Sequence, residues 1–201
     1  MIFEGLVVGM IIGKLRGGKL KNLGKFMFKS SFLLVFSLLL QLGASILISI
    51  GNQKVIDNRM VIYIVAYIML FIVLFFNLER GAVWLILIGS IANFAAIVIN
   101  GGSMPIDISI LEKMGFDNML QSIQMGALPN YISISEANPL TIYLAKRFAT
   151  PEWYPFKQIF SIGDIGISLG LLLLTQGIMQ MNRHHYSAKT LNFDYKGKVK
   201  L

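Results

Sequence analysis

Residues 160–180, which read FSIGDIGISLGLLLLTQGIMQ, are long and apolar enough to cross a bilayer, yet they contain an acid near their start. A transmembrane helix takes about 20 mostly apolar residues. A carboxylate exposed to lipid is costly, so Asp164 is expected to face the interior of a helical bundle. At helical spacing, small residues fall on one face and polar residues on a second face roughly 160° away: Gly163, Gly166 and Gly170 on the first, and Ser161, Asp164 and Ser168 on the second. We therefore expect this helix to pack between neighbouring helices.

Five apolar segments are present in the chain, at 2–15, 30–50, 60–77, 81–100 and 159–180. Only 14% of the residues are charged, against about 25% in a soluble domain. The first segment is short, because residues 2–13 would form about 18 Å of helix and the hydrocarbon core is about 30 Å thick. The sequence predicts an all-α, multi-pass cell-membrane protein. It has about five transmembrane helices in a single domain covering 1–201.

The distribution of charge predicts an orientation. The segments 14–29, 78–80 and 181–201 share one side of the membrane and carry twelve basic and two acidic residues. The other side carries six basic and eight acidic residues. Since cytoplasmic loops are enriched in Lys and Arg, the N-terminus is expected outside and the C-terminus inside. The loop 14–29 and the tail 181–201 are expected to contact anionic lipid.

The one long connection, residues 101–158, is predicted to lie outside the cell. It is too long for a bare loop, so we expect amphipathic helices on the membrane face, with a loosely ordered loop as the alternative. Ser109 with Glu112 has capping-box spacing, and Asn138-Pro139 is typical of a helix start. Trp153, Tyr154 and Phe156 are expected to anchor the return to the membrane.

Glycines repeat at every fourth residue of the first segment, at Gly5, Gly9 and Gly13. This is the small-xxx-small pattern of close helix packing. Packing within the chain is the first expectation. Contact with a second copy or with another membrane protein is the second.

Polar residues within the spans gather in the half of the membrane that is predicted to be outer. They are Glu4, Gln41, Ser45, Asn93, Asn100, Ser161, Asp164 and Ser168. One interpretation is that each of these residues only makes an ordinary hydrogen bond between helices, worth about 0.6 kcal/mol. Their collection on one side instead favours a ligand-binding pocket that opens outward. For Asp164 the competing interpretation is a helix cap in the first turn. As a site residue it is expected to point toward Asn100, with Asn93, Gln41 or Lys157 as further candidate partners.

Other chemistries find little support in the sequence. Residues 166–170 match G-x-S-x-G, but that motif needs a strand-turn-helix and a histidine base. The chain has no cysteine, and adjacent His184 and His185 do not share a helix face, so no metal or cofactor is expected. The net charge of +8 is attributed to membrane orientation, and no nucleic acid partner is expected.

Two short motifs, NGG-x-MP at 100–105 and SIGD at 161–164, follow a glycine-rich first span with a basic Leu15-Arg16-Gly17-Gly18 stretch. With these features, nearly the whole chain resembles the bacterial membrane proteins known as domain of unknown function 5317. The family often has a second Gly-Asp upstream of SIGD, where this chain has Leu144-Ala145-Lys146-Arg147. The resemblance implies a fold and no activity.

Three functions follow from these observations. The first is a non-catalytic protein that binds a small ligand, a lipid or a protein partner from outside. The second is a transporter or transporter subunit, which would need a polar path past the apolar run 169–174. The third is an intramembrane enzyme that uses Asp164 with Asp107 or Glu4.

Overall fold

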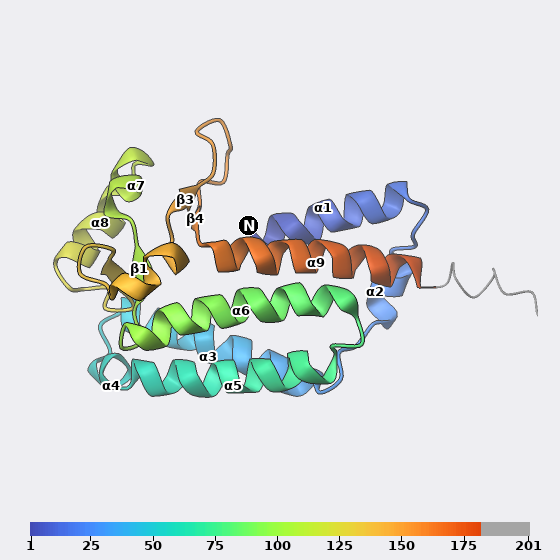
Figure 1. Ribbon diagram of the computed structural model, residues 1–201, viewed down its shortest axis with the longest axis horizontal. Helices are drawn as coiled ribbons and strands as arrows, with labels where there is room; N and C mark the ends of the chain where they lie inside the picture. The colour runs from blue at the N-terminus through green and yellow to red at the C-terminus, as the bar shows by residue number, and fades with distance from the viewer. Residues whose placement is uncertain (182–201) are drawn as a thin grey trace, which may run out of the picture.

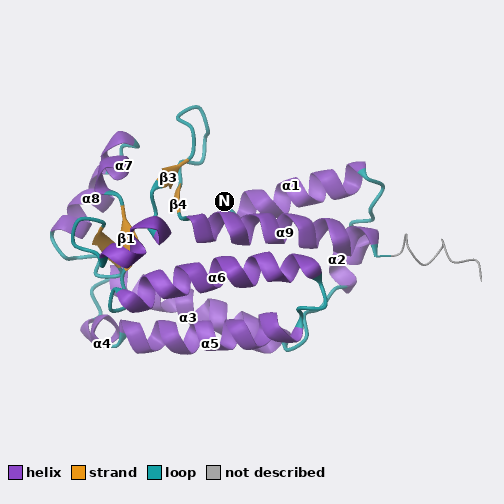
Figure 2. Ribbon diagram, viewed as in Figure 1, coloured by secondary structure: helices purple, strands orange, loops and turns teal. Residues whose placement is uncertain are grey.

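The computed structural model describes residues 1–181 and is mostly helical (Figures 1 and 2). Four helices are long and apolar enough to cross a membrane: α3 (Ser31–Ser49), α5 (Arg59–Phe76), α6 (Gly81–Ile99) and α9 (Ile162–Gln180). They begin and end within three residues of the predicted ranges. A fifth helix, α1 (Ile2–Leu15), has 14 residues and is about 21 Å long.

The long helices form a row that packs in the order α1, α9, α6, α5, α3, with each helix packed mainly on its neighbours in this order. In Figure 1, α1, α9, α6 and α5 lie one below another, and α3 lies behind α5 and α6. This order differs from the order in the chain, since the first helix lies against the last. Along the helix axes the row has two ends. Short α2 (Lys21–Lys25) and the turn at 77–80 lie at one of these ends, the α2 end. Short α4 (Gln53–Asp57) and the long connection lie at the opposite end. The tail beyond residue 181, including both histidines and most of the basic tail, lies outside the described residues.

Helix α9 lies between α1 and α6 and uses a different face for each. On one side, a Cβ added to Gly163 would lie 2.6 Å from the Gly89 carbonyl of α6, and one added to Gly170 would lie 2.9 Å from the Ile86 nitrogen. On the other side, Ser168 donates a hydrogen bond of 2.8 Å to the Met1 carbonyl at the start of α1. The two backbones on the glycine side therefore come closer than any side chain would allow.

Helix α1 runs parallel to α9 and turns Gly5, Gly9 and Gly13 toward it. All three are buried, and a Cβ at Gly9 would lie 2.8 Å from the Leu172 carbonyl. Most of the remaining surface of α1 is apolar, with exposed side chains such as Phe3 and Ile11, and the charged residues Glu4 and Lys14 lie near its two ends. One face of α1 therefore packs on α9, and most of the rest is open apolar surface.

An apolar cluster fills the row near the α2 end. Its buried members come from α5, α6 and α9: Leu74, Val83, Ile86, Leu174 and Ile178. Side chains at 23–28, around α2, pack over this cluster. Asn22 adds a hydrogen bond of 2.9 Å to the Met179 carbonyl at the end of α9. Near the α2 end, the buried contacts between α5, α6 and α9 are therefore made by apolar side chains.

The connection 101–158 contains both short helices and short strands, so the all-helical expectation for this segment was wrong. Its elements are β1 (Met104–Ile106), α7 (Ile108–Lys113), α8 (Asp117–Gln124), β2 (Tyr131–Ser133), the 3-10 helix η1 (Pro139–Leu144) and β3 (Phe148–Ala149), which pairs with β4 (Ile159–Phe160). Strand β1 pairs in parallel with β2, with Met104 opposite Tyr131 and Ile106 opposite Ser133. Non-local pairing of this kind leaves no periodic signal in three-residue strands.

The turns and helix starts of this segment are set by glycines with positive φ and by capping side chains. Gly101 and Gly102 have φ of 62° and 89°, and a Cβ at Gly102 would lie 2.9 Å from the Met60 nitrogen. Asn138 caps η1 by accepting from the Leu140 nitrogen, as Asn-Pro predicts. The predicted capping box at Ser109 was wrong, because α7 begins earlier and Asp107 accepts from the Ser109 nitrogen. Asp107 is the better acceptor, since its charge also favours the helix N-terminus.

The close contact between α1 and α9 leads to a test. Gly9→Leu should lower the melting temperature of the detergent-purified protein by several degrees, because overpacking a tight contact costs about 1–3 kcal/mol. The matched control is Val8→Leu on the exposed side of the same helix, which should change it little. Equal melting of the two variants would mean that the glycine face of α1 makes no such contact.

Candidate functional site

The first turn of α9 is closed by a reciprocal pair of hydrogen bonds. The Asp164 nitrogen donates to Ser161 Oγ, and the Ser161 nitrogen donates to Asp164 Oδ2, both at 3.0 Å. This capping box satisfies two N–H groups that would otherwise lack a partner at the helix start. Asp164 is therefore a cap, as one of the two sequence interpretations holds.

The same carboxylate also reaches two other parts of the chain. Asn93 of α6 donates from Nδ2 to Asp164 Oδ1 at 2.8 Å, and its own Oδ1 accepts from Ser161 Oγ at 2.7 Å. Asn93 can lie this close because Gly163 and Gly89 bring the two backbones together. Ser161 is fully buried and Asn93 is nearly so. The cap and the interhelical contact are thus one polar network.

Lys146 completes the network with an ion pair. Its Nζ lies 3.0 Å from Asp164 Oδ2, and the two side chains are 23% and 14% exposed. The lysine comes from the connection, where two backbone hydrogen bonds hold it beside Ile106 of β1: its nitrogen donates to the Pro105 carbonyl, and its carbonyl accepts from the Asp107 nitrogen. Both oxygens of the carboxylate are satisfied, and the charge is compensated within a partly buried setting.

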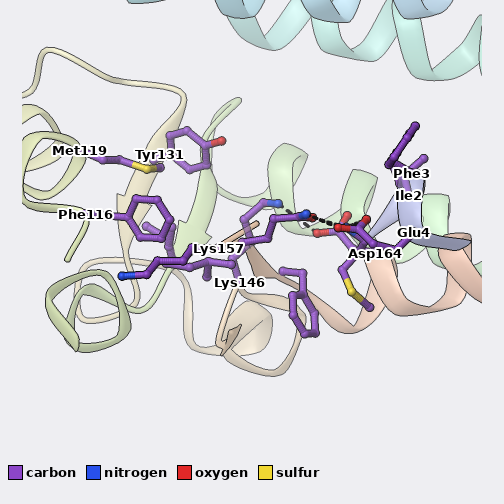
Figure 3. A pocket seen from close by; sticks show the side chains of 14 residues that line it. Ile2, Phe3, Glu4, Phe116, Met119, Tyr131, Lys146, Lys157 and Asp164 are labelled. Atoms are coloured by element: carbon purple, nitrogen blue, oxygen red, sulfur yellow. Dashed lines mark hydrogen bonds and ion pairs between the residues drawn. The ribbon is translucent and has the colours of Figure 1, made fainter. Parts of the chain in front are cut away.

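A cavity of about 440 Å³ opens beside this ion pair, and we call it the Lys157 cavity (Figure 3). It lies where α1, α9, β1 and the connection meet. Its charged lining comes from Glu4, Lys146, Lys157 and Asp164, and its apolar lining includes Phe3, Phe116, Met119 and Phe160. Its volume falls in the range of small-molecule sites, about 300–1,000 Å³.

A second cavity of about 220 Å³ lies between α3, α5 and α6, and we call it the Gln41 cavity. Its polar lining includes Gln41, Ser45, Asn93 and Asn130, together with the hydroxyl-bearing Tyr63 and Tyr67. Asp164, Lys146 and Tyr131 line both cavities. The ion pair therefore lies on the boundary between the two spaces.

The cations of the Lys157 cavity differ in their partners. Lys146 is paired with Asp164. Lys157 donates 3.1 Å to the Met114 carbonyl, and within residues 1–181 no carboxylate pairs with it. In Figure 3 the Lys146 side chain reaches toward Asp164 while the Lys157 side chain extends away from it. An ammonium held only by a backbone carbonyl has donors left for a further acceptor.

Glu4 lies on the other side of the cavity and is held by several donors. It forms an ion pair of 2.5 Å with the amine of Met1 and accepts hydrogen bonds from Gln158 and from the Tyr154 hydroxyl, the latter at 3.3 Å. Burial and the nearby Glu4 carboxylate raise the pKa of the Tyr154 phenol above its usual value. The phenol therefore stays protonated as the donor at neutral pH.

The predicted site residues divide into two groups. The structure brings Asp164, Ser161 and Asn93 into one network, with Glu4 in the Lys157 cavity and Gln41 in the Gln41 cavity. Asn100 lies apart: its amide donates to Thr141 and accepts from the Asn138 nitrogen, which attaches η1 to the end of α6. Ser168 faces α1. These two residues line neither cavity, so Asp164 does not point into a site shared with Asn100.

Lys146 and Tyr131 are site residues that the sequence analysis missed. Both come from the strand-containing connection, whose fold gave no periodic signal. The available signal was electrostatic: an acid inside a span needs a cation, and Lys146, Arg147 and Lys157 are the basic residues that shortly precede Asp164. Within residues 1–181, no three His, Cys, Asp or Glu side chains are grouped to hold a metal ion.

The ion pair can be tested by a double-mutant cycle. Asp164→Asn and Lys146→Met should each destabilise the protein, because each leaves the other charge without its partner. The double variant should be more stable than the sum of the single effects predicts, by at least about 0.5 kcal/mol, the lower range for contacting pairs. Unfolding is followed by differential scanning calorimetry in detergent. Strictly additive effects would contradict the ion pair.

Comparison with known proteins gives a family and no relative of known activity. No curated protein matches the chain, and no solved structure does either. The family comparison covers the capping box, Asn93 and Lys146, three of the five helices in full (α3, α5 and α6), and α9 as far as residue 176. Residues 25–176 match a family of unknown function, DUF5317, and because they make up most of the 201 residues the chain belongs to that family.

Proposed function

We propose that this chain is a multi-pass membrane protein that binds a small amphiphilic molecule with an anionic group in the Lys157 cavity, from the outer side of the membrane. The observation that carries the proposal is the combination within one cavity. An apolar lining lies beside a lysine whose only described partner is a backbone carbonyl. A ligand with an acidic head and a short apolar body would complement both.

The outward direction rests on charge. Both segments at the α2 end, 14–29 and 77–80, are basic overall: they carry Lys14, Arg16, Lys19, Lys21, Lys25, Lys29 and Arg80 against the single acid Glu79. The positive-inside rule makes this end cytoplasmic. The cavity lies at the opposite end of the row. The basic loop is also the proposed contact for anionic lipid on the inner leaflet.

We assign α1 as a fifth, partial span. Its glycine face lies on α9, and Phe3, Ile11 and Leu15 are exposed as lipid-facing residues would be. At about 21 Å it is shorter than the hydrocarbon core. Lys14, in its last turn, is placed to extend toward the headgroups. Because α1 is short, there is space next to its N-terminal end, and the Lys157 cavity lies there, lined by residues 1–4.

The two alternative functions have weaker support. A transporter needs a polar path across the membrane, whereas the buried cluster around Leu174 and Ile178 places hydrocarbon between α5, α6 and α9 near the α2 end. An enzyme that paired Asp164 with Asp107 would need both carboxylates at one site. Asp107 instead caps α7 and does not line the cavity. Glu4 does share the cavity with Asp164, but hydrogen-bond donors hold both carboxylates.

The orientation is tested with single cysteines, since the natural chain has none. Gln121→Cys in α8 should react with an impermeant maleimide on intact cells, whereas Gly24→Cys in α2 should react only after the membrane is opened. Gly24 is suitable because a Cβ there would meet no atom of residues 1–181 within 4 Å. Labelling of the residue 24 site alone in intact cells would reverse the orientation and place the cavity in the cytoplasm.

Ligand binding is tested with three probes that share a chain length and differ in charge: octanoate, octanol and octylamine. Octanoate should raise the melting temperature of the protein in nanodiscs, and the other two should have less effect. Lys157→Met should weaken octanoate binding by about tenfold or more, which corresponds to about 1.4 kcal/mol.

The control is Lys113→Met, an exposed lysine of the same connection that does not line the cavity. It should bind octanoate as the natural protein does. Equal stabilisation by octylamine, or equal loss in the two lysine variants, would contradict an anion site at Lys157.

A further inference from the structure

A third open site lies at the α2 end of the helices, away from the Lys157 and Gln41 cavities, in a groove of about 400 Å³ between the start of α6 and the end of α9. We call it the Arg80 groove. Its walls are Leu85 and Ala82 on one side and Leu173, Leu174 and Ile178 on the other, with Arg80 at its end. Leu85 and Leu173 are 37% and 47% exposed. The groove is apolar along its length and has a cation at its end.

The groove exists because α6 and α9 are in close contact only over part of their length. A Cβ at Gly170 would lie 3.0 Å from the Ala82 carbonyl, so the two helices touch there. Seven residues further along α9, a Cβ at Gly177 would meet no atom of residues 1–181 within 4 Å, and the same holds at Gly81. Because the helices run antiparallel, the end of α9 extends past the first residue of α6. No residue among 1–181 fills the space beyond this contact.

Arg80 is held by an aromatic ring and a thioether sulfur. Its guanidinium carbon lies 4.4 Å from the centroid of the Phe26 ring, and Nη1 lies 3.7 Å from the Met181 sulfur. Its Nε is buried, and no acceptor among residues 1–181 reaches it. Stacking on an aromatic ring orients a guanidinium without using its fork of N–H donors. Those donors match the oxygens of a phosphate.

The neighbouring acid, Glu79, is close enough to Arg80 for the two charges to attract each other, but its ion pair is with Lys29. The hydrogen bond from Lys29 holds the pKa of the Glu79 carboxyl below its usual value. No ion pair joins Arg80 to a carboxylate in the described part of the chain. The surrounding loop 14–29 carries six basic residues and no acid. The end of the groove is therefore electropositive as well as polar.

We propose that the Arg80 groove binds a phospholipid with an anionic headgroup, with the phosphate on Arg80 and an acyl chain between Leu85 and Leu173. A basic residue at the mouth of a groove between transmembrane helices is a recurrent site for anionic lipid headgroups. The apolar walls distinguish this site from a site for a soluble anion, because a soluble anion would bind Arg80 and leave the apolar walls uncovered. The lipid is a specific ligand, in contrast to the diffuse attraction of the whole basic loop. The proposal is independent of the Lys157 cavity.

The test is native mass spectrometry of the detergent-purified natural chain titrated with phosphatidylglycerol or phosphatidylcholine. One phosphatidylglycerol should bind more tightly than phosphatidylcholine by about tenfold or more. A large excess of inorganic phosphate should not displace it. Arg80→Gln should remove this preference between the two lipids.

Two further variants separate the site from general charge and from misfolding. Lys21→Gln removes an equal charge from the exposed surface of α2 outside the groove, and should change the affinity by less than twofold. Gly177→Leu keeps Arg80 and fills the groove. The open space at this position predicts normal melting with weakened binding of both lipids.

Three results would overturn the proposal. The first is equal affinity for the two lipids, and the second is equal loss in Arg80→Gln and Lys21→Gln. The third is displacement by inorganic phosphate, which would make the site one for a free anion. None of them bears on octanoate binding in the Lys157 cavity, so the two proposals can fail separately.

Discussion

The polar side of the structure depends on how the Asp164 carboxylate is satisfied. A charge at this depth would be costly without partners, and three parts of the chain supply them: the first turn of α9, the α6 amide Asn93, and Lys146 from the connection. Each partner also fixes its own element relative to the others. Both cavities follow from this arrangement, since the carboxylate and its lysine form a wall of each.

Long-range features were predictable where a periodic signal ran along a whole helix. The four long spans follow from apolar length. The predicted polar face of α9 does not stay together, because Ser161 bonds Asn93 of α6, the helix that Gly163 and Gly170 also contact, whereas Ser168 bonds Met1 at the start of α1. The partner Asn93 could be named because it lies at matching depth in a neighbouring span. Helical periodicity alone is enough to predict features of this kind.

The rest was not predictable, because it depends on pairings between distant short segments. Strand β1 has three residues and is held by β2 and by Lys146, which follow it by tens of residues. No local pattern distinguishes such a strand from a loop. This is why Lys146 was missed and why Asn100 was wrongly expected to face Asp164. The amide of Asn100 instead attaches η1, a contact set by the path of the chain after the Gly101-Gly102 turn.

The row of helices closes with the first helix against the last, and this has a consequence for synthesis. Arg16 contacts Gln176, which is 160 residues further along the chain. During translation α1 is made long before α9 exists, because synthesis runs from the N-terminus onward. Its glycine face therefore cannot reach its place on α9 until residues 162–180 have been made. The α1 side of the Lys157 cavity is then completed last, because Phe160 and Asp164 also line it, so a ribosome-bound intermediate that lacks residues 160–180 would lack this cavity.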